Sequence, residues 1–356
     1  TRHHVSNWTL RANEDHSGTW GPTAPPKNWR TEGLQSSDIT LPKLLQKAGY
    51  HTIHVGKAHF GAIETSGAEP LNLGFDRNVA GHSAGAPASY LGENSFGNDL
   101  PVLDNYPRGV PGLTEYHNKP VHLTDALTEK AKQLISQASV KNKPFFLNMA
   151  HYAVHTPIEP HPRLVAHYQN KAYANTDIDI PEVEQNYASL VEGMDESLGA
   201  LIQHLNDLGI AENTLVIFTS DNGGLSGHTR ETSPRGTELN SHNWPLNSGK
   251  GSAYEGGTRV PYIAAWAKPS TKTEIQKKWP IALNSTSKQP LMIEDLFPTI
   301  LSVANASQQI PKDYKLDGID VTGAWLAPSQ KIQETNKRAL IFHYPHVWGP
   351  HGPGYQ

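Results

Sequence analysis

The chain alternates between helical patterns of apolar residues and short apolar runs. Apolar residues recur every three or four positions in four stretches, which predicts helices: residues 40–48, 122–138, 181–208 and 293–303. Four other segments read as strands, the first three of them buried: residues 52–55, 145–150, 215–218 and 259–266. Helices that alternate with buried strands favour an α/β fold, with a mostly parallel sheet sandwiched between helices.

Turn and capping residues mark the ends of these segments. Asp38 or Thr40 can cap the first helix, Pro42 lies in its first turn, and Gly49 ends it. Gly209 ends the long helix in the same way. Residues 62–120 are rich in glycine, proline and serine, so we expect loops there over a functional face.

Composition excludes several classes of protein. With 356 residues the chain has room for one large domain or two smaller ones. Its 30 Lys and Arg against 34 Asp and Glu leave no basic excess for a nucleic-acid partner. No stretch is apolar for long enough to span a membrane, and the absence of cysteine excludes thiolate metal sites within these residues. Histidine is frequent, with 19 residues, and suits proton transfer near neutral pH.

Polar residues follow three of the predicted strands directly. Lys57 and His59 follow the first, His155 follows the second, and Asp221 and Asn222 follow the third. Because ligands bind beyond the carboxyl ends of parallel strands, these loops should share one edge of the sheet.

Each motif also has an ordinary structural interpretation. The sequence Asp221-Asn222-Gly-Gly is typical of a tight turn, although its two oxygen donors also suit Ca²⁺ or Mg²⁺. Lys57 and His59 could belong to a solvated loop, but strand alternation would point both side chains the same way. His155, before Thr-Pro, could equally be a turn residue.

A glycine-rich segment carries a second lysine. Residues 248–257 contain Lys250 but lack the spacing of a phosphate-binding P-loop. A flexible linker is the alternative, although Lys, Tyr and Glu are not linker composition. Two lysines, two histidines and an Asp-Asn pair together describe a site for a tetrahedral anionic ester, in which cations stabilise charge and histidines move protons. A nucleophile is missing from this set.

The motifs together resemble the type I sulfatases of the alkaline phosphatase superfamily. Four segments carry the resemblance, in order: LPKLLQKAGYHTIHVGKAHFG at 41–61, PFFLNMAHYAVHTP at 144–157, the segment from YASL to SDNGG at 187–224, and SGKGSAYEGGTRVP at 248–261. The resemblance implies that Asp221 and Asn222 ligate Ca²⁺ and that Lys57 and Lys250 hold sulfate oxygens. It also implies that His155 protonates the leaving alcohol and that His59 helps the sulfated hydrate to collapse.

The resemblance also implies parts that these residues do not contain. The family uses a formylglycine made from Cys or Ser in a Cys/Ser-x-Pro-x-Arg motif, which we expect upstream of Thr1 together with an Asp-Asp calcium pair. We interpret residues 1–342 as most of the catalytic domain and residues 343–356 as the start of a C-terminal subdomain. Export to the periplasm or the medium is expected by the same resemblance.

We expect the substrate to be a sulfated polysaccharide fragment. Candidate sugar contacts lie in the long loops, where loop packing is an equal alternative: His82, Tyr90, His228, Arg230 and His242. Two other functions stay open: a phosphatase or phosphonate hydrolase of the same superfamily, and a non-catalytic sulfoglycan-binding protein. A zinc phosphatase would favour Asp-His over Asp-Asn.

Overall fold

The computed structural model describes residues 33–100, 108–141, 143–173, 177–225 and 243–330, with residues 332, 335 and 337–340. The predicted subdomain boundary at residue 343 lies outside this part. The α-helices described are α1 (Leu41–Lys47), α2 (Leu123–Val140), α3 (Glu182–Asp207), α4 (Glu255–Thr258), α5 (Glu274–Lys278), α6 (Leu296–Val303) and α7 (Thr322–Leu326). None of these helices combines the length and apolarity that crossing a bilayer requires.

The described strands form two ladders. In the first, β1 (His51–Gly56) lies between β2 (Arg77–Val79) and β3 (Phe145–Ala150), and both neighbours run parallel to it. In the second, β4 (Leu215–Thr219) pairs with β5 (Tyr262–Trp266) in the antiparallel sense. The register of β1 and β3 sets His54 opposite Asn148, which matters for the site described below.

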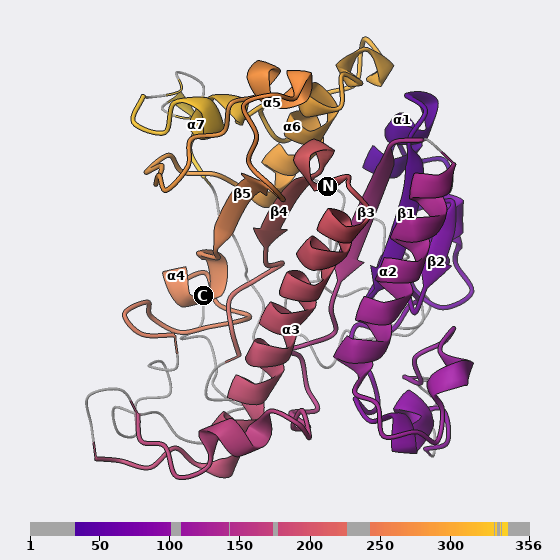
Figure 1. Ribbon diagram of the computed structural model, residues 1–356, viewed down its shortest axis with the longest axis vertical. Coiled ribbons are helices and arrows are strands. Elements are labelled where there is room, and N and C mark those ends of the chain that lie inside the picture. The colour runs from indigo at the N-terminus through magenta and orange to yellow at the C-terminus, as the bar shows by residue number, and fades with distance from the viewer. Residues whose placement is uncertain are drawn as a thin grey trace, which may run out of the picture.

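Helices cover both faces of the parallel ladder (Figure 1). On one face α2 and α3 pack side by side, and Ile53 and Val55 of β1 are fully buried beneath them. On the other face α1 and α6 enclose a smaller core, with Leu45 and Leu301 buried at its centre and Phe146 of β3 packed against it. The predicted sandwich of sheet and helices is therefore confirmed.

The helix boundaries follow the predicted signals. Thr40 caps α1 by accepting a hydrogen bond from the backbone N–H of Lys43, and Pro42 lies in the first turn. Gly209, with φ +70°, follows the end of α3 in the left-handed conformation that favours glycine. The helix predicted at residues 293–303 is a short 3₁₀ turn, Ile293–Asp295, that continues into α6.

Three details of the strands differ from the prediction. β5 begins at Tyr262 rather than residue 259 and runs antiparallel to β4, because the intervening chain returns to the carboxyl end of β4, where Gly223 N–H donates to Gly257 O. β3 and β4 are half-buried rather than buried, since each has a ladder on one side only among the described residues. β2, a three-residue edge strand, had no apolar period to reveal it.

Candidate functional site

Lys57 and Asp221 meet although 164 positions separate them in the chain. Lys57 follows β1 and Asp221 follows β4, and the Lys57 Nζ lies 3.6 Å from Asp221 Oδ2. The lysine side chain is 18% exposed and the carboxylate 64%. The two strand ends therefore lie close together as predicted, although β1 and β4 belong to different ladders in the described residues. The contact leaves the carboxylate open to a further ligand.

His155 and Lys250 complete a charged group around this pair. Burial, together with the positive charge of Lys57, lowers the pKa of Lys250 to about 8, against an opposing effect of Asp221. Burial likewise lowers the pKa of His155 to about 4, assisted by the charges of Lys250 and Lys57. His155 is therefore neutral at pH 7, beside two cations and one anion.

An anion in this group would reverse both pKa shifts. Two ammonium groups held near each other destabilise their charged forms, and a bound oxyanion would remove that repulsion. It would also raise the pKa of His155, because a negative charge favours the imidazolium. The electrostatics of the site therefore favour a small anion and prepare the histidine to gain a proton when one binds.

Paired glycines bring Lys250 to this place. The carbonyl of Gly224 accepts the Lys250 N–H at 2.9 Å, and the N–H of Gly223 donates to Gly257 O at 2.9 Å. A Cβ on Gly223 would clash with the carbonyl oxygen of Gly256. The two Gly-Gly pairs therefore allow two backbones to approach closely, and residues 248–257 are not a flexible linker.

His59 lies on an irregular segment rather than a strand. β1 ends at Gly56, and His59 has φ +52°, so strand alternation does not fix where its side chain points and the argument made from it was wrong. The His59 N–H donates to His82 O at 2.9 Å, and its ring packs so closely on Gly85 that a Cβ there would clash. His82 thus lies beside His59, with burial lowering its pKa to about 4.

Buried tyrosines fix the segment that carries His155. The Tyr90 hydroxyl donates to His155 O at 2.9 Å, and the Tyr152 hydroxyl donates to Ala80 O at 2.8 Å. Both tyrosines are at most 1% exposed. Glu159 accepts hydrogen bonds from the Ser89 hydroxyl and the Tyr90 N–H. Tyr90 is therefore a support for His155, and the prediction that it contacts a sugar is wrong, because its side chain is fully buried.

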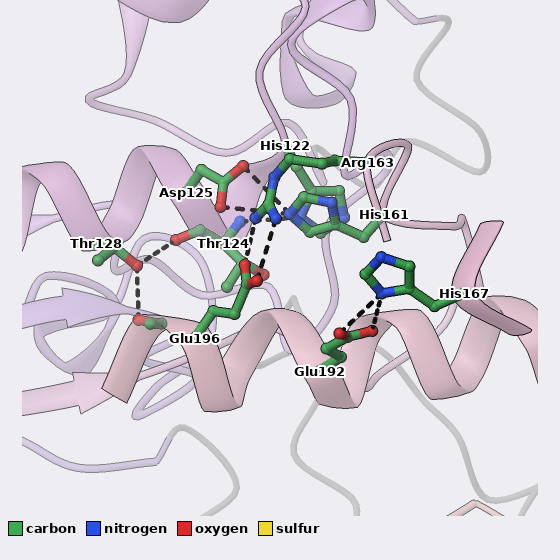
Figure 2. Close-up of polar contacts among 10 residues, drawn as sticks. His122, Thr124, Asp125, Thr128, His161, Arg163, His167, Glu192 and Glu196 are labelled. Carbon is green, nitrogen blue, oxygen red and sulfur yellow. Dashed lines mark hydrogen bonds and ion pairs between the residues drawn. The ribbon is translucent and has the colours of Figure 1, made fainter. Parts of the chain in front are cut away.

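Side chains of the segment after His155 form ion pairs with the helices α2 and α3 (Figure 2). His161 Nε2 lies 3.2 Å from Asp125 on α2, and Arg163 forms a two-pronged ion pair with Glu196 on α3. The rings of His122 and His161 are 4.4 Å apart. Further along, His167 lies 2.9 Å from Glu192 on α3. The segment from His161 to His167 is thus held to α2 and α3 by ion pairs.

The metal prediction rests on two donors. Asp221 and Asn222 supply carboxylate and amide oxygens, the ligand types that Ca²⁺ prefers, and the Asp221 carboxylate is open to solvent. In the described ranges no three His, Asp or Glu side chains are arranged to hold a metal ion. Since Ca²⁺ takes about six to eight oxygens, these two residues fit part of a coordination shell.

Three predicted substrate contacts lie outside the described residues: His228, Arg230 and His242. Sequence reasoning missed others that support the site, above all His54 and Asn148. Asn148 interrupts the otherwise apolar strand β3, and His54 lies between Ile53 and Val55 of β1; these interruptions were a signal that could have found them. Asn243 was missed too; its amide donates to Gly224 O and Ser248 O.

This fold and site define a class of protein: an α/β protein that gathers two lysines, a histidine and an aspartate at its strand ends, suited to a tetrahedral anionic ester. The chain belongs to the sulfatase family of the alkaline phosphatase superfamily, and the family match covers residues 9–306.

Individual relatives agree with this assignment. A sulfatase of Formosa agariphila is 32% identical over 348 aligned residues, which cover 88% of this chain and 57% of that protein. The N-acetylgalactosamine-6-sulfatase of Mus musculus is 31% identical over 296, covering 81% and 49%. The crystal structure of Ps i-CgsB superposes with a TM-score of 0.60 at 27% identity, covering 83% of this chain and 59% of that one. The chain thus spans about half the length of the curated relatives it matches.

Proposed function

We propose that the intact protein hydrolyses sulfate esters of a carbohydrate. The observation that carries this proposal is the convergence of Lys57, Lys250 and His155 around Asp221, which creates a positively charged place for an oxyanion beside a neutral histidine. Family membership supports the choice of sulfate over other tetrahedral anions.

In the proposed reaction the two lysines bind sulfate oxygens and stabilise the charge that develops on them. His155 gives a proton to the leaving alcohol, once the bound anion has raised its pKa. His59 takes a proton when the sulfated hydrate collapses. The nucleophile is proposed to be the hydrate of a formylglycine, contributed by a part of the protein other than these 356 residues.

Asp221 and Asn222 would hold part of the coordination shell of a Ca²⁺ ion, which when bound supplies positive charge to the sulfate and the nucleophile. Asp221 also helps to place Lys57, because its carboxylate lies 3.6 Å from the Lys57 ammonium. Replacing Asp221 with Asn should therefore weaken calcium binding and release Lys57. Calorimetric titration with Ca²⁺ measures the first effect.

The carbohydrate part of the proposal rests on relatives. One relative is named an N-acetylgalactosamine-6-sulfatase, and Ps i-CgsB has been crystallised with k-i-k-neocarrahexaose. We propose a sulfated glycan of this general kind as substrate, and export to the periplasm or medium as the place of action.

Peptide mass spectrometry of the natural protein is the first test. A Cys or Ser converted to formylglycine, together with sulfate release from sulfated galactans that is lost in Lys250→Met, would support the proposal. An unmodified residue at that place and no sulfate release would favour a non-catalytic sulfoglycan-binding protein. Stoichiometric zinc with phosphatase turnover would favour a phosphatase.

A further inference from the structure

A histidine in the middle of β1 is buried beneath the site. His54 is fully buried, and its ring lies against Phe60 and Phe75, with centroids 5.4 and 5.2 Å away. A buried imidazole costs free energy unless its nitrogens find partners. Both ring nitrogens of His54 have one.

The two partners determine which nitrogen carries the proton. His54 Nε2 lies 3.0 Å from the carbonyl oxygen of Gly56, which can only accept, so Nε2 is protonated. His54 Nδ1 lies 3.1 Å from the amide nitrogen of Asn148, which donates to it across the β1–β3 ladder. Burial also lowers the pKa of His54 to about 4, which keeps the ring neutral at pH 7.

The bond to Gly56 falls where the chain leaves the sheet. Gly56 has φ +105°, and a Cβ there would clash with Ala150 O, so the turn follows a tightly constrained path. The next residue, Lys57, donates its N–H to Ala150 O at 2.7 Å. The side chain of His54 therefore restrains the last peptide before the lysine that contacts Asp221.

The same ring also contacts the loop beside His59. A Cβ on Gly81 would clash with Cδ2 and Nε2 of His54, so this loop lies directly on the ring. His82, the next residue, accepts the N–H of His59. The imidazole of His54 thus contacts the turn before Lys57, the loop of Gly81 and His82 that holds His59, and the neighbouring strand β3.

We infer that His54 is a positioning residue: its ring, protonated on Nε2 and held by Asn148, fixes the turn at Gly56 and so sets the place of Lys57. The inference rests on the proposed function only for the role of Lys57 in binding sulfate. The restraint on the backbone is independent of that role.

Substitutions of His54 can remove its hydrogen bond to Gly56 and its hydrogen bond to Asn148 separately or together. His54→Gln can place an amide N–H near the position of Nε2 and keep the bond to Gly56. His54→Asn can keep the bond to Asn148 but is too short to reach Gly56. His54→Leu removes both. His204→Leu is the matched control, because His204 also bonds through Nε2, to Ser136 and to Lys132 O, at the α2–α3 contact away from the site.

The first readout is hydrogen exchange of the Lys57 amide in the intact protein. Loss of one hydrogen bond to a buried carbonyl should speed exchange about tenfold in His54→Leu and His54→Asn. His54→Gln should stay near the wild-type rate. His204→Leu should leave this amide unchanged while it lowers the thermal midpoint.

The second readout is the affinity for inorganic sulfate, measured by calorimetry. A displaced Lys57 should weaken binding about tenfold or more, since misplacement by about 1 Å has effects of this size. His54→Gln should restore most of the affinity, and His204→Leu should leave it intact.

The outcomes distinguish the two proposals. If wild-type protein binds no sulfate, the proposed function fails while amide exchange still decides the role of His54. The inference is overturned if His54→Leu changes Lys57 exchange no more than His204→Leu does, or if His54→Asn preserves the site as well as His54→Gln.

Discussion

Lowering the pH from 7.5 to 5.5 should destabilise this protein strongly, because several histidines are buried in neutral form. Burial lowers the pKa of four of them, His54, His82, His151 and His155, to about 4, and that of His122 to about 3. In the unfolded chain each has a pKa of about 6.5. Between these values the unfolded state binds protons that the folded state does not, so stability falls as the pH falls.

The magnitude follows from linkage. At pH 5.5 each unfolded histidine carries about 0.9 proton and its folded counterpart almost none, so unfolding takes up about four to five protons. Integrated from pH 7.5, the loss is about 1.3 kcal/mol for each histidine, and about 7 kcal/mol for the five. At about 2.1 cal/mol/K per residue over 356 residues, this lowers the thermal midpoint by about 9 °C.

Carboxylates contribute little in this window. The pKa of Asp76 is lowered below 3.8, mainly by hydrogen bonds from Thr52 and Gln46 against an opposing effect of burial, so its stabilisation is lost only below about pH 4. The assay is urea unfolding at intervals between pH 7.5 and 5.5, where the slope of the unfolding free energy reports proton uptake. His151→Asn should reduce that slope by about one proton. Equal stability at both pH values, or an uptake below two protons, would refute this account.

Three substitutions test the site itself. Gly223→Ala should lower the unfolding free energy by about 1–3 kcal/mol and weaken sulfate binding, because its Cβ meets Gly256 O. Its control, Gly199→Ala on an open face of α3, should stabilise the protein by about 0.5–1 kcal/mol. Urea unfolding compares the two variants, and similar effects would contradict the close approach of the two backbones. Tyr90→Phe should cost about 1–3 kcal/mol and reduce kcat, because the buried carbonyl of His155 loses its donor; an unchanged kcat with lowered stability would show a purely structural role. Lys250→Met should raise the pKa of His155 above its value of about 4, since one nearby positive charge is removed. NMR titration of the His155 ring measures this pKa, and an unchanged value would contradict the proximity of Lys250 to His155.

The features that the sequence predicted correctly are those that depend on interactions between residues close together in the chain. The helices α1, α2, α3 and α6 were predicted because an apolar period is a local property, and the ends of α1 and α3 because caps and glycines act within one turn. The helices α4, α5 and α7 were missed because four or five residues are too few to show a period. β2 was missed because three residues have no period and are held only by their partner strand.

The sequence by itself determined which residues were available for chemistry and that they follow strands. It could not determine that β5 runs antiparallel, because that depends on where the long connection after β4 returns. Nor could it show that Tyr90 supports His155 from within the core, since burial is decided by segments far apart in the chain.

The electrostatics of the site were likewise decided only by tertiary structure. Lys57, His155, Asp221 and Lys250 come from four separate segments. The lowered pKa values of His155 and Lys250 arise from burial and from charges that folding brings close. Hydrophobic patterning acts over a few residues, whereas desolvation and Coulomb interactions depend on distances in space. The chain therefore encodes its elements locally, and the anion site exists only once β1, β3 and β4 are packed.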